Sequence, residues 1–197
     1  MNSHMGKGRL EAFSDGVLAV IITIMVLELR PPHEPTLGAL LEVVHPFFAY
    51  VLSFVYVGIY WNNHHHLFQS VEHVNGRILW ANNLLLFCLS LVPFSTSWMG
   101  ETDFALVPTV AYGLTLFLPA FAYLLLSVLL VRLHGDRSRL ALAIGRGLKE
   151  WLSLLLYILG IAGAFLHPYV AFAFYMAVAA IWFIPDRRIE RQLETGR

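Results

Sequence analysis

Four side chains that can carry charge or form hydrogen bonds stand just ahead of a long apolar run near the N-terminus: Arg9, Glu11, Ser14 and Asp15. Such residues are costly at the edge of a membrane helix and usually have partners or a function. Glu11 and Asp15 are four residues apart and repel each other on a helix, so we expect Asp15 to need a donor from another helix. Helix capping and topology signalling are the plain alternative, because acids favour the N-terminal end of a helix.

A second group of reactive side chains is the histidine cluster at His64, His65 and His66, with His73 and His45 farther away. Successive residues on a helix point about 100° apart, so at most two of the three adjacent histidines could share a site. Metal-binding pairs prefer a spacing of three or four, which leaves only distant acids as co-ligands, and we predict no metal site. We expect one or two of these histidines to hydrogen-bond Ser14 or Asp15. Because histidine titrates near pH 6.5, such a contact could make the protein pH-sensitive.

The composition places these residues in a membrane protein. Hydrophobic residues make up 58% of the 197 and charged residues 13%, with a mean hydropathy of +0.66. Soluble domains have about 45–50% apolar and about 25% charged residues. The formal net charge is zero, so nothing draws the chain toward nucleic acid, and we predict no nucleic-acid partner.

Uncharged runs divide the chain into helices, since a crossing needs about 20 mainly apolar residues. The run at 151–184 is too long for one crossing and should turn at His167-Pro168, because proline disfavours helix in the residue before it. The first segment has acids near both tips, so it should lie inside a bundle rather than bare in lipid. The expected fold is all-α with six transmembrane helices per subunit, at about 9–29, 37–61, 78–99, 104–131, 148–166 and 168–184.

The positions of the basic residues support the count of six transmembrane helices. Of the 13 lysines and arginines, only Arg30 falls on the opposite side when six helices are drawn. By the positive-inside rule both termini are then cytoplasmic in a multi-pass protein of the cell membrane. We take residues 1–5 as a cloning scar and start, 6–184 as the six-helix domain, and 185–197 as a basic cytoplasmic tail.

Three stretches carry a resemblance to a known family. The pattern Arg9-x-x-x-Phe13-Ser14-Asp15 runs directly into the apolar segment 16–29, and further matching patterns occur at 61–68 and from Asn82-Asn83 to 93–95. These resemble the endosomal and lysosomal potassium channel called transmembrane protein 175, and specifically its prokaryotic relatives. The specific likeness covers about the first half of the chain.

The resemblance implies a homotetramer whose first helices line a central pore. Its motif residues Arg9, Phe13, Ser14 and Asp15 would anchor that helix, with His64, His65 and Asn82 as a supporting network. The pore-facing row would be Val20, Thr23 and Leu27, and Val20 stands where the family usually has Ile or Leu at the narrowest point. Without the resemblance, an apolar row with one threonine is more often ordinary helix packing.

We therefore predict passive conduction of monovalent cations, potassium above all, past a hydrophobic constriction on the first helix, with no cofactor and no enzymatic activity. A small secondary transporter of a cation or small solute is the alternative, although the two halves of the chain show no inverted repeat. A membrane enzyme using the histidines and a metal would need a second cluster on the same membrane face, and the sequence offers none.

Overall fold

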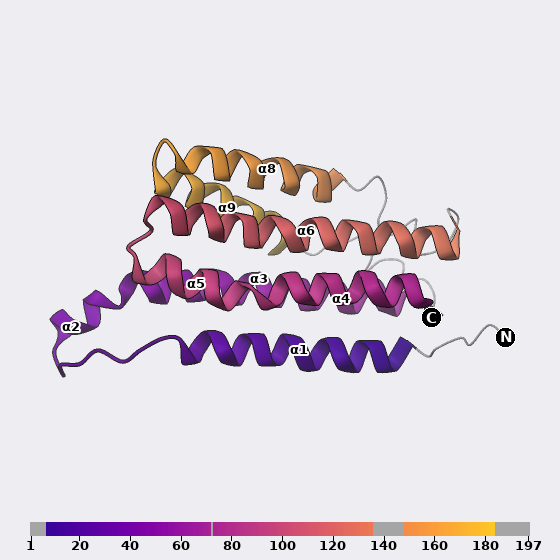
Figure 1. Ribbon diagram of the computed structural model, residues 1–197, viewed down its shortest axis with the longest axis horizontal. Coiled ribbons are helices and arrows are strands. Elements are labelled where there is room, and N and C mark those ends of the chain that lie inside the picture. The colour runs from indigo at the N-terminus through magenta and orange to yellow at the C-terminus, as the bar shows by residue number, and fades with distance from the viewer. Residues whose placement is uncertain (1–6, 72, 136–147, 184–197) are drawn as a thin grey trace.

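Residues 7–71, 73–135 and 148–183 are described by the computed structural model, and in these ranges the chain is a bundle of α-helices (Figure 1). Residues 1–5, which we took as a cloning scar and start, and the basic tail at 185–197 lie outside the described residues. The helices are α1 (Lys7–Leu27), α2 (Leu37–Glu42), α3 (Val44–Gln69), α4 (Gly76–Ser90), α5 (Val92–Glu101), α6 (Leu106–His134), α8 (Leu148–Ala164) and α9 (Pro168–Phe183).

Among the described residues, four helical segments are long and apolar enough to cross a membrane: α1, α3, the α4–α5 pair and α6. A break at Leu91, just before Pro93, separates α4 from α5 within the third of these segments. The last apolar run is a hairpin of α8 and α9 that turns at His167-Pro168, and these two helices are shorter, with 17 and 16 residues.

Several helix ends differ from the sequence-based expectation. α3 continues to Gln69 instead of ending near residue 61, so the histidine cluster lies within the helix. Hydropathy shows where a helix leaves the apolar layer of the membrane. The helix itself continues for as long as its residues maintain the backbone hydrogen bonds of an α-helix. α1 begins at Lys7 and ends at Leu27, two residues earlier at each end than expected. The segment expected as 37–61 is divided at Val43 into α2 and α3.

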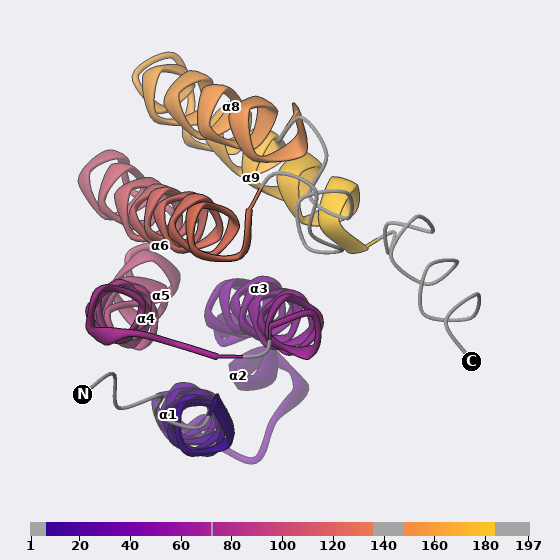
Figure 2. The same ribbon diagram turned by 90° about the vertical axis from the view of Figure 1, so that its right-hand side faces the viewer.

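The helices are arranged in layers with α1 on one side of the bundle. Viewed along the bundle, α1 lies apart at one edge, α3 and the α4–α5 pair come next, and α6, α8 and α9 form the far side (Figure 2). α1 contacts α3, α4 and α5 through one buried stripe. That stripe is made of Leu10, Ser14, Leu18, Ile21 and Met25.

Two glycines make room for a buried tyrosine where α6, α8 and α9 meet. Tyr175 is fully buried, and its hydroxyl donates to the carbonyl oxygen of Thr109 at 3.2 Å. A Cβ added at Gly113 would lie 2.0 Å from the Tyr175 hydroxyl oxygen, and one at Gly160 would lie 2.7 Å from its ring. The tyrosine is thus held between two helices that must both lack a side chain at the contact.

Replacing Gly113 by alanine should therefore destabilise the protein by about 1–3 kcal/mol, since the ring has no free direction in which to move. Gly58→Ala is the matched control, because a Cβ there meets no atom within 4 Å. In a helix interior the control should be neutral or stabilising by up to about 1 kcal/mol. Thermal unfolding in detergent measures both, and equal melting temperatures for the two variants would contradict the packing argument.

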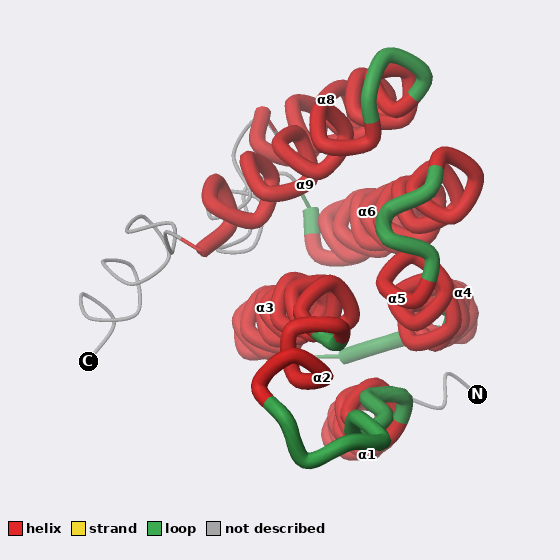
Figure 3. Tube along the Cα trace, turned by 90° about the vertical axis from the view of Figure 1, so that its left-hand side faces the viewer, coloured by secondary structure: helices red, strands yellow, loops and turns green. Residues whose placement is uncertain are grey.

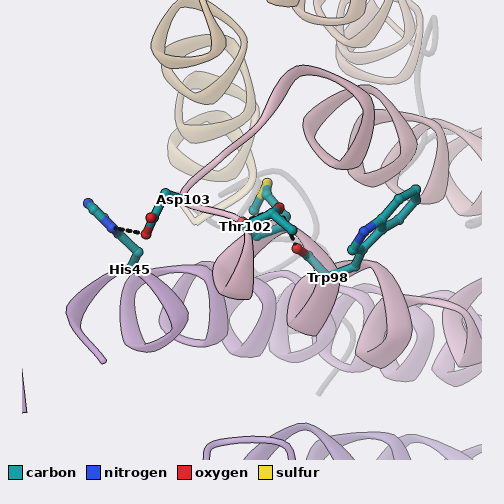
Figure 4. A network of polar contacts seen from close by, with 5 residues as sticks. His45, Trp98, Thr102 and Asp103 are labelled. Carbon is teal, nitrogen blue, oxygen red and sulfur yellow. Dashed lines mark hydrogen bonds and ion pairs between the residues drawn. The ribbon is translucent and has the colours of Figure 1, made fainter. Parts of the chain in front are cut away.

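The end of the bundle away from the N-terminus carries the linker from α1 to α2, the α5–α6 turn and the α8–α9 turn (Figure 3). Asp103 and Phe104 in the α5–α6 turn have φ angles of 50° and 57°, a region that non-glycine residues rarely adopt. The turn is tied to α3, because His45 Nδ1 and Asp103 Oδ1 are 2.8 Å apart (Figure 4). At the end of α5, Thr102 Oγ1 donates to the Trp98 carbonyl at 2.7 Å. These contacts fix the turn that sends the chain from α5 into α6.

Candidate pore helix and its anchoring network

The three residues expected to face a pore lie on the side of α1 that the subunit leaves uncovered. Val20 is 55% exposed and Leu27 is 79% exposed, and Thr23 between them is exposed as well. Their spacing of three and four puts them in one row, and that row is on the face turned away from the buried stripe. Within one subunit, the row therefore contacts neither α3 nor the far layers.

The hydroxyl hydrogen of Thr23 points toward the backbone of its own helix. The hydroxyl group donates to the carbonyl oxygen of Val20 at 2.8 Å, one turn earlier in the helix. Its hydrogen is therefore occupied, and the oxygen lone pairs are left to accept from water or to contact a cation. This is the one oxygen-bearing side chain in the row.

A groove of about 940 Å³ runs along α1 where it meets α4 and α5. Its walls are mainly apolar and include Phe13, Val20, Phe94 and Trp98, while Glu28 and Glu101 lie at one end. Ser97 of α5 donates to Glu28 Oε2 at 3.3 Å across this end. The groove exists because α1 covers only part of the α4–α5 surface.

A buried hydrogen-bond chain fixes the other end of α1. Asn82 of α4 donates from Nδ2 to Ser14 Oγ at 3.0 Å, and Ser14 Oγ donates to the Leu10 carbonyl at 2.8 Å. His64 Nε2 of α3 lies 2.8 Å from Asn82 Oδ1. Since that oxygen can only accept, His64 must carry its proton on Nε2. The three side chains, Ser14, His64 and Asn82, are all buried, so this chain joins α1, α3 and α4 in one arrangement without a charge.

Asp15 has its donor in the indole of Trp61, whose Nε1 lies 3.0 Å from Asp15 Oδ1. The ring of His65 stacks on Trp61 with centroids 6.1 Å apart, and Gln69 Nε2 lies 2.7 Å from His65 Nε2. We expected a histidine to hydrogen-bond Ser14 or Asp15 directly. In the structure, His64 is connected to Ser14 through Asn82, and His65 stacks on Trp61, which contacts Asp15.

The two remaining motif residues do not attach α1 to its own subunit. Phe13 is 59% exposed, and Arg9 is exposed and has no hydrogen bond or ion pair with any residue that the structure describes. Both lie on the same side of α1 as Val20, at helical spacing from it. Anchoring by Arg9 and Phe13 remains a prediction, because no contact among the described residues accounts for it.

One anchor was not expected from the sequence. Lys7 donates from Nζ to the Phe68 carbonyl at 2.9 Å, in the last turn of α3. A cation near a helix C-terminus is stabilised by the free carbonyls and the helix dipole. The signal was present as a lysine just ahead of the helix expected at 9–29, but its partner could not be identified, because the second helix was expected to end near residue 61, well before Phe68.

Nothing in the described ranges suggests a metal centre, since no three histidine, cysteine, aspartate or glutamate side chains there are placed to share an ion. The arrangement instead consists of an oriented helix with an exposed apolar row and one neutral polar anchor.

The chain is similar to known proteins over different shares of its length. The family described as endosomal/lysosomal potassium channel TMEM175 matches residues 9–93, which hold α1, α3, α4 and the anchoring network. A protein named a potassium channel from Chryseobacterium sp. (strain P1-3) is 55% identical over 190 residues, covering 96% of this chain and 99% of that protein. The human protein named endosomal/lysosomal proton channel TMEM175 is 32% identical over 107 residues, covering 48% of this chain and 21% of the human protein.

A solved structure agrees with the whole bundle. The crystal structure titled as a lysosomal potassium-selective channel TMEM175 homolog from Chamaesiphon minutus superposes with a TM-score of 0.81 at 27% sequence identity. The match covers 90% of this chain and 96% of that one, so the shared fold extends beyond the segment of the family match.

Proposed function

This chain belongs to the TMEM175 family of potassium channels, and from that premise we propose that it conducts potassium ions passively through a pore lined by α1. It is a multi-pass membrane protein, and its relatives are named as channels rather than as transporters or enzymes. The observation that carries the proposal is the exposed row Val20, Thr23 and Leu27, which lies opposite the buried stripe of the same helix.

Four copies of the chain would complete the pore by placing their α1 helices around a shared axis. Support comes from how little of α1 the subunit covers and from the polar residues near both tips, Asp15 and Glu28, which disfavour lipid as the covering. Cyclic contacts between unlike surfaces close into rings, and the groove beside α1 offers one such surface. The proposed homotetramer would thus add an oligomeric state to the family assignment.

The constriction would be a ring of Val20 side chains, with Thr23 one turn farther along and Leu27 beyond it. An apolar ring can gate by dewetting or by forcing ions to lose part of their water. Potassium loses water more easily than sodium because it is the larger ion of equal charge. The Thr23 oxygens, with their hydrogens turned to Val20, would supply partial replacement contacts.

The charge distribution supports six crossings with both termini in the cytoplasm. The start of α1, the start of α4, the end of α6 and the start of α8 lie at one end of the bundle (Figure 1). These helix ends carry Lys7, Arg9, Arg77, Arg132 and Lys149, whereas Arg30 follows the opposite end of α1. By the positive-inside rule the basic end faces the cytoplasm. α8 and α9 would then complete the fifth and sixth crossings as a short hairpin.

Ion flux into liposomes containing the purified protein tests the proposal. Potassium flux should rise linearly with the gradient, whereas saturation and exchange would indicate the transporter alternative. Sodium and proton flux are measured in the same vesicles, because mammalian relatives are named proton channels. Absence of potassium flux from a well-folded protein would refute the channel proposal.

Thr23→Val should reduce the preference for potassium over sodium, because valine keeps the shape of threonine and removes its oxygen. Thr23→Ser keeps the oxygen and should preserve the preference. The ratio of potassium to sodium flux in matched liposomes measures the effect. Equal ratios for wild type and Thr23→Val would show that the hydroxyl takes no part in selectivity.

A further inference from the structure

The groove between α4 and α6 is built from two matching stripes. On α4, Arg77, Ala81 and Leu84 follow one another at spacings of four and three, and Leu125 and Leu129 lie opposite on α6. Arg132 continues the α6 stripe one turn beyond Leu129. The two helices run in opposite directions side by side, so both stripes end in an arginine at the same end of the bundle (Figure 1).

This groove has the size and chemistry of a ligand site. It holds about 790 Å³, within the range of about 300–1,000 Å³ for small-molecule sites. Its walls are apolar over most of their length, and none of the described residues lining it is acidic. Arg77 and Arg132 are both exposed, and neither side chain has a hydrogen bond or ion pair with another described residue.

The position of the groove along the bundle matches the depth of lipid headgroups. Trp80 lines it next to Arg77 and is 77% exposed, as expected of an indole at the boundary between acyl chains and water. Arginines between membrane helices at this depth bind anionic headgroups. A polar end with two cations and an apolar remainder fits a molecule with one anionic head and long hydrocarbon chains.

We propose that the α4–α6 groove binds an anionic phospholipid of the leaflet that covers the basic end of the bundle. The phosphate lies between Arg77 and Arg132, where a planar guanidinium can donate two parallel hydrogen bonds to phosphate oxygens. An acyl chain lies against Leu84, Leu125 and Leu129. A second copy of the chain is the competing occupant. The lipid is favoured because it offers a phosphate and a hydrocarbon chain side by side, which matches the cationic end and the apolar walls of the groove.

Native mass spectrometry of the full-length protein, titrated with phosphatidylglycerol or phosphatidylcholine of identical chains, tests the site. The double variant Arg77→Gln/Arg132→Gln should bind phosphatidylglycerol about 30-fold more weakly, from about 1 kcal/mol for each arginine. Arg77→Lys/Arg132→Lys keeps the charge and should retain most of the binding. Arg30→Gln removes one charge at the opposite end of the bundle and should leave the affinity unchanged.

The acyl part of the site is tested separately. Leu125→Trp fills the groove without altering its charge and should weaken binding of both lipids. Glycerol phosphate, which has the headgroup phosphate and no chains, should not bind. Equal losses for the arginine double variant and Arg30→Gln, unchanged binding by Leu125→Trp, binding of glycerol phosphate as tight as that of the lipid, or cross-linking of the groove to a second copy would each overturn the proposal.

Discussion

Tryptophan in place of Val20 should reduce potassium flux to the level of empty liposomes. The side chain at this position is 55% exposed, so an indole fits the isolated subunit without a clash. Around a shared axis, however, four indoles would fill the narrowest part of the proposed pore. Val20→Asn should have the opposite effect and raise flux, because a polar ring does not dewet.

Leu155→Trp is the matched control for this experiment. Leu155 lies on α8, in the layer away from α1, and is 51% exposed, so the same side chain is added to an apolar surface far from the axis. Flux should stay at the wild-type level. Size-exclusion chromatography shows whether each variant assembles, and a fully assembled Val20→Trp protein that conducts normally would remove this row from the ion path.

Asn82→Leu should cause the largest loss of stability. Leucine has a similar volume but leaves the Nε2–H of His64 without an acceptor and removes the donor to Ser14. Unsatisfied buried polar groups cost about 1–3 kcal/mol each, so we expect about 3 kcal/mol in total. The apparent melting temperature in detergent should fall by about 6–12 °C for a domain of this size.

A second substitution separates the network from simple packing. In His64→Phe/Asn82→Leu both partners of the buried contact are apolar, and such paired replacements can be nearly neutral. The double variant should therefore be more stable than Asn82→Leu alone. A double variant less stable than either single one would show that the hydrogen bond is not what the two residues contribute.

The sequence predicted an all-helical membrane protein, because this class depends on local composition. Apolar runs, the His167-Pro168 corner and the polar cluster in the first turns of α1 can be identified without tertiary information. The ends of α3 could not be placed, since the histidines leave the apolar layer while the helix continues to Gln69. This displaced end also concealed the contact of Lys7 with Phe68.

The candidate site was only partly predictable. Ser14, His64 and Asn82 were grouped by resemblance, but the order in which they connect depends on which side chains meet in three dimensions. The role of Trp61 was missed, because the sequence does not show that an indole at the end of the helix expected at 37–61 meets Asp15. Arg9 and Phe13 face away from the subunit, and no pattern within a single chain specifies what another chain contacts.

α1 has more hydrogen bonds to neighbouring helices in its first half than at its C-terminal end, so its first half can serve as a pivot. Hydrogen bonds of Lys7, Ser14 and Asp15 tie the first half of α1 to α3 and α4. At the other end, Ser97 donates to Glu28, the residue after α1, and no other described helix forms a hydrogen bond with Glu28 or the last turn of α1. Leu27 lies about 18 Å beyond Asp15 along the helix, so a tilt of about 5° about the tied half would move Leu27 by about 1.6 Å. The proposed pore would then open and close by rotation of α1 about its tied half. The pore radius would change most at Leu27, and the tied half would stay nearly still.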